Sequence, residues 1–397
     1  MAAYLSATLL TCGILLWESK RIVSFPVPGR LSAKQWLLLI FASAPLLIVS
    51  GARWGVGTDF FHTYLPEYLG LEWLRSGATG ELAQELFKPV LGQMNRFFGM
   101  TTVQETLDYS LTVLSDSAPL FRIILELSVY LKTGFRGVMW LTSAIVEIAV
   151  FYCIFTESRN PVLAAFLYVA GGSFFLSLNI VRQFLAISIC LLAIPAIRDG
   201  KPLRFFLLIA VAILFHSSAV VMLPCYLLRW VRVTPLPILV GTAVLLALSP
   251  AVSPVVEWLL PKLGLGYYLK YFGSDSPETE FEILFFAINL CYLALGAMCW
   301  KKISEQESLL RIWYYMTAAG TFFLALSGSL PLMKRLNFYY AAPQFLLLPE
   351  LLELEEREKI KKIFTVVVIL LFTAEMVISV MVFNKNGVLP YRVAEWY

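Results

Sequence analysis

The side chains that could do chemistry in this sequence are a few ionisable residues beside long apolar stretches. Asp59 and His62 lie three residues apart in GTDFFHTYLPEY, a spacing that places both on one face of a helix. A carboxylate just outside an apolar segment can accept the proton of an attacking hydroxyl group. The simpler interpretation is that Asp59 caps the N-terminus of this helix and that His62 forms hydrogen bonds at an interface. The motif by itself is compatible with both interpretations.

Two arginines stand at the edge of later apolar segments. Arg182 and Gln183 open one helix in NIVRQFLAIS, and Arg335 follows Lys334 in SLPLMKRLNFYY. A guanidinium matches a diphosphate in bidentate geometry, and a neighbouring amide adds a further donor. An isolated arginine would instead extend to lipid headgroups, which is also the role expected of Lys334. Taken together, Arg182, Gln183 and Arg335 predict a site for a diphosphate.

His216 is one of two histidines and stands between apolar runs in AILFHSSAVVML, before Ser217 and Ser218. A histidine that forms hydrogen bonds between helices is at least as common as a catalytic one. We therefore regard His216 as the second candidate for a general base, after Asp59.

No metal-binding pattern accompanies these residues. The two histidines are far apart, the six cysteines occur singly without a CxxC pair, and no acidic cluster suggests a magnesium site. We expect neither a metal nor another cofactor. The net charge of +4 is spread along the chain without a basic stripe, which argues against a nucleic-acid partner.

The elements that must position these side chains are membrane-spanning helices. Of the 397 residues, 59% are hydrophobic and 15% are charged, which excludes a soluble enzyme, a secreted disulfide-rich protein and a disordered regulator. We expect an all-α polytopic integral membrane protein, in a single domain (1–397), with about ten to twelve transmembrane helices of ~20 residues. The apolar blocks are 3–17, 35–51, 137–155, 161–179, 184–197, 203–216, 218–230, 235–250, 281–300, 312–330, 337–351 and 363–383.

Lysines and arginines in the short loops predict the orientation of the chain. These loops, which fall on one side and should be cytoplasmic, are 18–34, 198–204, 229–232, 301–311 and 357–362. The opposite side then holds two long segments, 52–136 and 252–279, in which aromatic residues and amphipathic runs predict interfacial helices. Arg53, Asp59, His62, Arg182, His216 and Arg335 all fall at this outer side. The sequence therefore predicts one site that faces outward.

An ordered set of motifs resembles the EpsG family of polysaccharide-biosynthesis membrane proteins. The motifs are GTDFFHTYLPEY (57–68), NIVRQFLAIS (179–188), FHSSAVVMLPCYLL (215–228), KRLNFYY (334–340), LLLPELL (346–352) and NGVLPYR (386–392). They cover the chain from about residue 35 to residue 397, in the order in which the family has them. Each motif is weak alone, whereas the ordered set is fairly specific.

The resemblance implies a Wzy-like polymerase of the bacterial inner membrane whose chemistry faces the periplasm. By this resemblance, the positions that match the functional motifs of the family are Asp59, Arg182 with Gln183, His216 with Ser217, Arg335, and Pro390 with Tyr391. One position departs from the family. Many relatives have an acidic residue directly before the Pro-Leu-Phe stretch, whereas this chain has SAPLFR, with Ala118 there and Asp116 two residues earlier. Asp116 is therefore an alternative to Asp59 and His216 as the base.

The function that we expect is polymerisation of undecaprenyl-diphosphate-linked oligosaccharides of an O-antigen, a capsule or an exopolysaccharide. In this interpretation Arg182, Gln183 and Arg335 bind the diphosphate or sugar, with Arg53, His62 and Tyr391 as further members. The expected partners are the lipid-linked oligosaccharide and the bilayer, and a separate chain-length regulator is a candidate. Three alternatives stay open: a glycosyltransferase that uses polyprenyl-phosphate sugars, an O-antigen ligase, and a non-enzymatic flippase of lipid-linked oligosaccharides.

Overall fold

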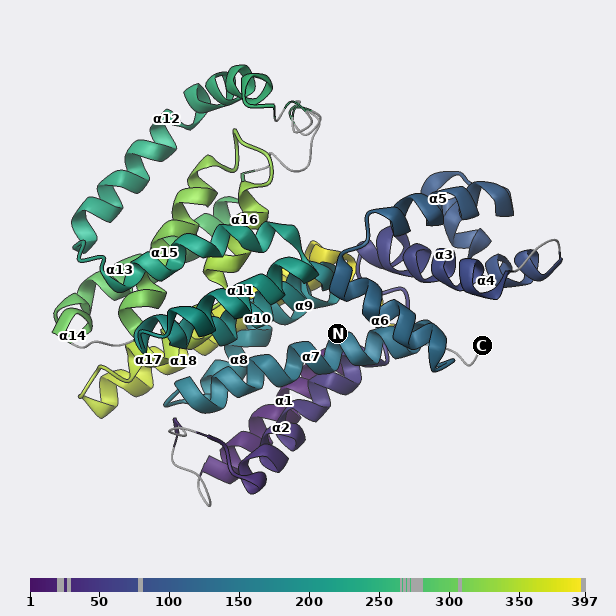
Figure 1. Ribbon diagram of the computed structural model, residues 1–397. Coiled ribbons are helices and arrows are strands. Elements are labelled where there is room, and N and C mark those ends of the chain that lie inside the picture. Colours follow the sequence, from purple (N-terminus) through teal and green to yellow (C-terminus); the bar gives the residue numbers. More distant parts are fainter. Residues whose placement is uncertain are drawn as a thin grey trace.

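Helices make up nearly all of the regular secondary structure in the residues that the structure describes. A computed structural model describes the chain except for residues 20–24, 27–29, 78–80, 265, 267–268, 270–271, 273–280, 306–308 and 394–397. The helices are α1 (Ala2–Ser19), α2 (Ala33–Gly51), η1 (Phe60–Tyr64), α3 (Leu65–Ser76), α4 (Glu81–Phe98), α5 (Val103–Ser115), α6 (Pro119–Tyr130), α7 (Gly134–Glu157), α8 (Pro161–Ala170), α9 (Ser173–Asn179), α10 (Val181–Arg198), α11 (Pro202–Phe215), η2 (Ser217–Arg229), α12 (Pro235–Lys262), α13 (Ile283–Met298), α14 (Trp300–Glu305), α15 (Leu309–Leu326), α16 (Met333–Ala341), α17 (Gln344–Leu352), α18 (Glu358–Met376), η5 (Val377–Val382) and η6 (Lys385–Gly387). Figure 1 shows their arrangement.

Seven of these helices are long and apolar enough to cross a membrane: α1, α2, α7, α10, α12, α15, and α18 together with η5. The pair α8 and α9 passes the same test and is bent by 49° at its break. Three shorter apolar helices, α11, η2 and α13, join them in the described part of the chain. The predicted all-α polytopic membrane fold is thereby confirmed. By length and composition, the described residues contain seven candidate spans, or eight if the bent pair is one span, so the predicted number of about ten to twelve stays a prediction.

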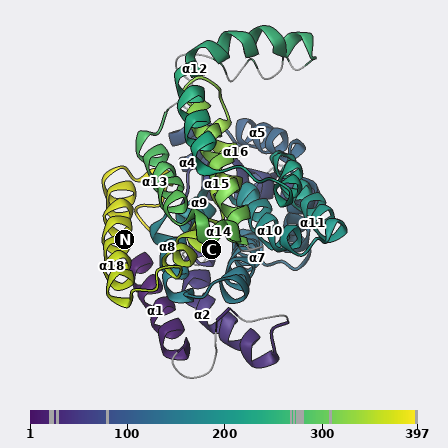
Figure 2. The ribbon, with the colours of Figure 1, turned by 90° about the vertical axis from the view of Figure 1, so that its left-hand side faces the viewer.

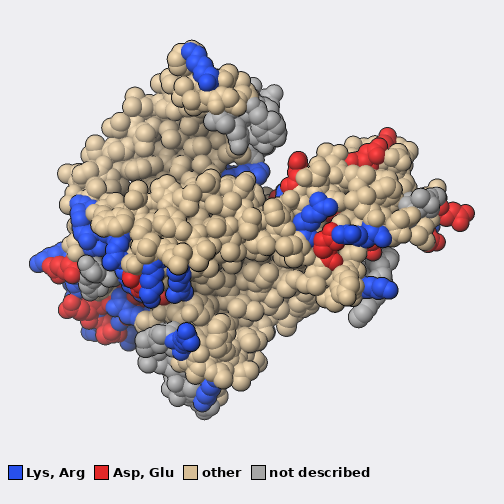
Figure 3. Space-filling model, viewed as in Figure 1, with Lys and Arg blue, Asp and Glu red and all other residues tan. Residues whose placement is uncertain are grey.

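Charged residues gather at two ends of the molecule, and an apolar belt lies between them (Figure 3). At one end, ion pairs join loops that are distant in the sequence. Arg198 binds Glu157 at 2.9 Å, Arg159 binds Glu350 at 2.6 Å, and Lys302 binds Glu356 at 2.8 Å. Four of the basic loops that the sequence assigned to one side are therefore close together, because Arg229 also donates to the carbonyl of Arg198.

The segment 52–136 forms a helical unit at the opposite end of the bundle. Helices α3, α4 and α5 project there beyond the spanning helices, and α6 runs back toward α7 (Figure 1). A capping box between Thr102 and Glu105 fixes the start of α5. Tyr68, Phe87 and Leu107 are buried within the unit, so the amphipathic runs bury their apolar faces against one another as well as toward the bundle.

Helix α12 differs from the sequence prediction. The sequence suggested a span over 235–250 and a separate interfacial helix within 252–279, whereas α12 continues without interruption to Lys262. It contains Pro250 and Pro254, which bend a helix because proline lacks an N–H and clashes with the preceding turn. The last part of α12 consequently turns across the top of the molecule (Figure 2). Most of 263–279 lies outside the described residues.

The segment 384–393 returns to the outer end and packs beside the first two helices. The Tyr4 hydroxyl donates to the carbonyl of Val388 at 2.8 Å, and the Tyr391 hydroxyl donates to the carbonyl of Val49 at 3.0 Å. The Gly57 amide donates to the carbonyl of Gly387 at 3.0 Å. This segment therefore supports the turn that leads to Asp59.

Candidate functional site

The turn between α2 and η1 sets the position of Asp59. Gly57 has φ of +96°, and a Cβ there would lie 2.5 Å from the carbonyl oxygen of Leu178. Only glycine fits this backbone against the end of α9. Beyond it, the Thr58 hydroxyl and the Asp59 amide both donate to Oδ1 of Asn179, at 2.9 Å and 3.0 Å. Asn179 thus holds the turn from a segment 120 residues away.

The carboxyl group of Asp59 makes no capping hydrogen bond to the helix that follows, although Asp59 occupies the N-cap position. Capping is therefore not what occupies this side chain. Burial raises the pKa of Asp59, and the positive charges of Arg335, His62 and Arg182 oppose that rise. A carboxylate with a raised pKa is a stronger base than an ordinary aspartate.

Arg182 lies at the first turn of α10, directly after the break at Ile180 that separates α9 from α10. Its Nη1 donates to Oε1 of Glu67 at 2.7 Å and to the carbonyl oxygen of Asp116 at 3.4 Å. Asp116 therefore contributes its backbone here, while its side chain is exposed. The guanidinium has further N–H donors on Nη2 and Nε with which to bind an anion.

Glu67 is the residue that the sequence analysis missed. Its side chain is fully buried, whereas that of Arg182 is 21% exposed. The Ser117 hydroxyl donates to Oε2 of Glu67 at 3.4 Å, so the carboxylate joins α3, α10 and the turn before α6. Burial outweighs the attraction of Arg182 and raises the pKa of Glu67 to about 7. The only sequence signal was an acid within the apolar face of LPEYLGL.

Gln183 and Arg335 bring α10 and α16 together. The side-chain amide of Gln183 donates to the carbonyl oxygen of Arg335 at 2.8 Å. Oε1 of Gln183 is buried and has no hydrogen-bond partner among the described residues. The charge of Arg335 acts on both Asp59 and His216. The structure therefore brings Arg335 to the same place as the residues from η1 and α10.

His216 lies in the turn between α11 and η2, where it begins a series of side-chain hydrogen bonds. Its Nδ1 lies 2.7 Å from Oγ of Ser218, which lies 2.9 Å from the hydroxyl oxygen of Tyr339 on α16. The contact is made by Ser218, and not by Ser217, which the family resemblance had paired with His216. Burial and the charges of Arg182 and Arg335 lower the pKa of His216 to about 4. The imidazole is therefore neutral near pH 7.

Two other predicted members, Arg53 and Tyr391, lie in different surroundings. Arg53 is buried among helices, where its Nη1 donates to the carbonyl of Ser50 and to Oγ of Ser143. Tyr391 packs edge-on against Tyr4 with ring centroids 5.3 Å apart. These contacts place Arg53 and Tyr391 in the packing around the Asp59 turn, and their role in substrate binding stays a prediction.

His62 lies on η1 and contacts helices α4 and α5. Its ring centroid is 4.8 Å from that of Phe98 and 5.6 Å from that of Phe97, both on α4. Its carbonyl oxygen accepts a hydrogen bond from the Tyr109 hydroxyl at 2.7 Å. His62 therefore joins the site to α4 and α5.

The arrangement thus joins two carboxyl groups, one neutral imidazole and two guanidinium groups at one end of the bundle. Such a set can accept a proton and bind an oxyanion at adjacent positions. Within the described residues, no group of three or more His, Cys, Asp or Glu side chains is placed to hold a metal ion.

Comparison with known protein families matches residues 36–393 to the model of the EpsG family. No curated protein and no solved structure matches the chain.

Proposed function

Because the chain belongs to the EpsG family, whose members have polysaccharide polymerase or glycosyltransferase-like functions, we propose that it polymerises lipid-linked oligosaccharide repeat units. In this proposal the lipid is undecaprenyl diphosphate, and the reaction takes place at the periplasmic face of the bacterial inner membrane. The observation that supports it best is the convergence of Asp59, His216, Arg182 and Arg335, which come from four separate elements. Base and anion-binding groups are the two requirements of glycosyl transfer from a diphosphate.

The reaction forms one bond and breaks one bond at the anomeric carbon of the growing chain. A hydroxyl of the incoming repeat unit attacks this carbon, and its proton passes to the carboxylate of Asp59. The bond to the diphosphate oxygen breaks, and undecaprenyl diphosphate leaves with the electron pair. Arg182 and Arg335 stabilise the negative charge that develops on the leaving group. His216, which is neutral near pH 7, is the second candidate for the base.

The Arg182–Glu67 ion pair is compatible with this role. Glu67 binds Nη1 of the guanidinium and fixes its position before substrate arrives. Preorganised donors stabilise a leaving group better than donors that must move into place. Gln183 contributes by joining α10 to the backbone of Arg335.

The test is to incubate the purified protein with its lipid-linked repeat unit and to separate the products by length on a gel. We expect a ladder of products from the wild-type protein and none from Asp59→Asn, Arg182→Ala or Arg335→Ala. Arg75→Ala is the matched control, since Arg75 makes an exposed ion pair with Glu126 on the same helical unit. That variant should give a normal ladder.

The products also distinguish the alternatives. A single added sugar without a ladder would indicate a polyprenyl-phosphate-dependent glycosyltransferase, and transfer of an unchanged glycan to another acceptor would indicate a ligase. Movement of the lipid-linked unit across vesicles without any new glycosidic bond would indicate a flippase. If Asp59→Asn gave a full ladder, the general base would have to be another residue, and His216 and Asp116 would be the candidates.

A further inference from the structure

A cavity of about 190 Å³ lies beside the candidate site. Three of its lining residues are direct neighbours of residues already described: Phe184 follows Gln183, Lys334 precedes Arg335, and Asn386 precedes Gly387. It extends from there between α9, α10, α16 and η5. The cavity therefore lies within the helical bundle, between elements that also carry residues of the candidate site.

Helix breaks form much of the cavity wall. The bend between α8 and α9 contributes Gly171 and Gly172, and the junction between α16 and α17 contributes Ala341 and Ala342. Gly172 has φ of +87°, a conformation that side chains rarely adopt. The π-helical segment η5 forms the opposite wall. At membrane depth, irregular backbone occurs only where protein covers it or where it lines a polar cavity.

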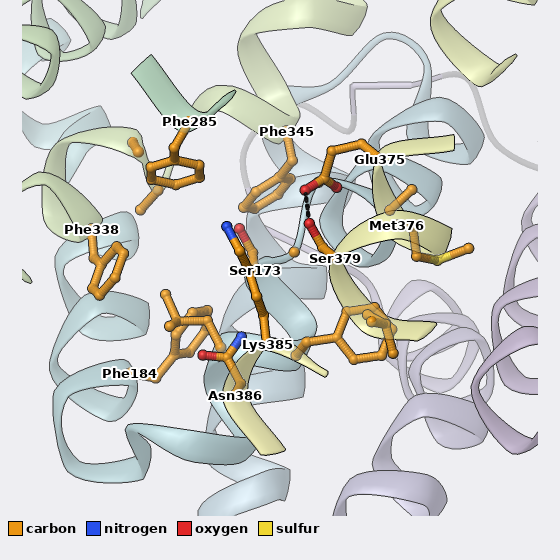
Figure 4. A pocket seen from close by; sticks show the side chains of 18 of the residues that line it. Ser173, Phe184, Phe285, Phe338, Phe345, Glu375, Met376, Ser379, Lys385 and Asn386 are labelled. Carbon is orange, nitrogen blue, oxygen red and sulfur yellow. Dashed lines mark hydrogen bonds between the residues drawn. The ribbon is translucent and has the colours of Figure 1, made fainter. Parts of the chain in front are cut away.

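Aromatic and polar side chains both line the cavity, as Figure 4 shows. Phe184, Phe285 and Phe338 lie across the cavity from Glu375, which has Phe345 and Met376 beside it. Oε1 of Glu375 accepts a hydrogen bond from the Ser379 hydroxyl at 2.6 Å. Its Oε2 is buried and has no partner among the described residues. A buried carboxyl oxygen without a partner costs free energy that a bound donor would recover.

Charged groups stand at the mouth of the cavity. Glu282 binds both Lys334 and Lys385, the latter at 2.7 Å. These three side chains are partly exposed and lie at the same end as Arg335. A substrate could therefore contact the mouth and the candidate site together.

We propose that this cavity is a subsite for one sugar ring of the glycan that the protein elongates, an inference that rests on the proposed function. A sugar offers hydroxyl donors for Oε2 of Glu375 and apolar C–H faces for the phenyl rings opposite. A polyprenyl tail would match the rings but would leave the carboxyl oxygen without a partner. The volume is below the about 300–1,000 Å³ of sites that bury a whole drug-sized ligand, so the cavity holds part of a larger substrate.

Binding measurements on the purified full-length protein test this subsite without requiring turnover. The two probes are the repeat-unit oligosaccharide freed from its lipid by mild acid, and farnesyl diphosphate as a short polyprenyl diphosphate. Affinity is read from the ligand-induced rise in unfolding temperature. We expect Glu375→Gln to weaken oligosaccharide binding about tenfold while leaving farnesyl diphosphate binding unchanged, since one hydrogen bond to a charged group is worth about that much. Ser379→Ala, which removes the donor that positions the Glu375 carboxyl group, should weaken oligosaccharide binding by a smaller factor and should also leave farnesyl diphosphate binding unchanged.

Thr373→Val is the matched control, because Thr373 lies on the same helix but donates to the carbonyl of Ile369 and lines a different groove. It should bind both probes as the wild-type protein does. Selective loss of farnesyl diphosphate binding in Glu375→Gln would overturn the proposal in favour of a lipid-tail site, and unchanged oligosaccharide binding in both variants would also overturn it. Oligosaccharide binding that depends on Glu375, in a protein that gives no ladder, would support the subsite while rejecting the polymerase.

Discussion

At the scale of single residues, Glu67 and Arg182 illustrate how a charged pair can position a site at a cost in stability. The Glu67 carboxyl is fully buried, and its pKa is raised to about 7 although a guanidinium lies 2.7 Å away. The desolvation of a buried ion pair often exceeds the attraction between its members. The pair is therefore better explained by the need to orient Arg182 than by the stability of the fold.

The raised pKa predicts how stability depends on pH. The folded protein binds the Glu67 proton more tightly than the unfolded chain does, so this contribution is present below pH 4.5 and is lost as the pH rises through about 7. Glu67→Gln should remove this dependence. We expect the unfolding temperature to fall between pH 5 and pH 8 by a smaller amount in Glu67→Gln than in the wild-type protein. At pH 8 the same variant should lose at least tenfold in ladder formation.

Glu126→Gln is the control for that experiment, because Glu126 pairs with Arg75 at the surface. An exposed pair contributes less than about 1 kcal/mol, so this variant should keep both the pH dependence and the ladder. An unaltered pH dependence in Glu67→Gln would show that another group carries it.

At the scale of elements, the turn from Gly51 to Asp59 determines where the candidate base lies. It passes so close to α9 that Gly57 has no room for a Cβ. The carbonyl of Gly387 and the side chain of Asn179 then bind it from two distant segments. The base is therefore positioned by three parts of the chain that meet at one end of the bundle.

Gly57→Ala should consequently abolish or strongly reduce ladder formation, because the new Cβ would displace the turn from the Leu178 carbonyl. Gly77→Ala is a close control: Gly77 also has a positive φ, of +62°, but nothing lies within 4 Å of a Cβ there. That change should cost only about 1–2 kcal/mol in unfolding free energy and should leave the ladder intact. Equal activity of the two variants would contradict the role given to the turn.

From periodicity and charge, the helices could be predicted more completely than the contacts between the helices. The apolar blocks and the basic loops were readable because helices in lipid need long apolar runs and because lysines and arginines mark the loops. The sequence also selected Asp59, Arg182, Gln183, His216 and Arg335, which the structure brings together. It did not reveal Glu67 or the pairing of Arg53 with Ser143, since a buried polar contact between distant segments leaves no local pattern. The continuation of α12 past Pro250 was missed because proline is expected to end a helix.

At the scale of the whole molecule, the two charged ends predict opposite sides of a membrane. Gln104 on α5 and Lys201 in the α10–α11 turn are exposed at the two ends. In a background without the six native cysteines, Gln104→Cys should react with a membrane-impermeant maleimide added to intact spheroplasts. Lys201→Cys should react only after lysis. The reverse labelling pattern would place the candidate site on the cytoplasmic side and would reject the proposed orientation.

The segment 384–393 has a consequence for how the protein is made. It supplies the carbonyl that holds Gly57 and packs against Tyr4 near the first residues of the chain. A chain in which residues 384–393 are not yet in place therefore lacks part of the support for Asp59. We therefore expect the turn that carries Asp59 to be fully supported only after the end of the chain has been synthesised and has packed against the first two helices.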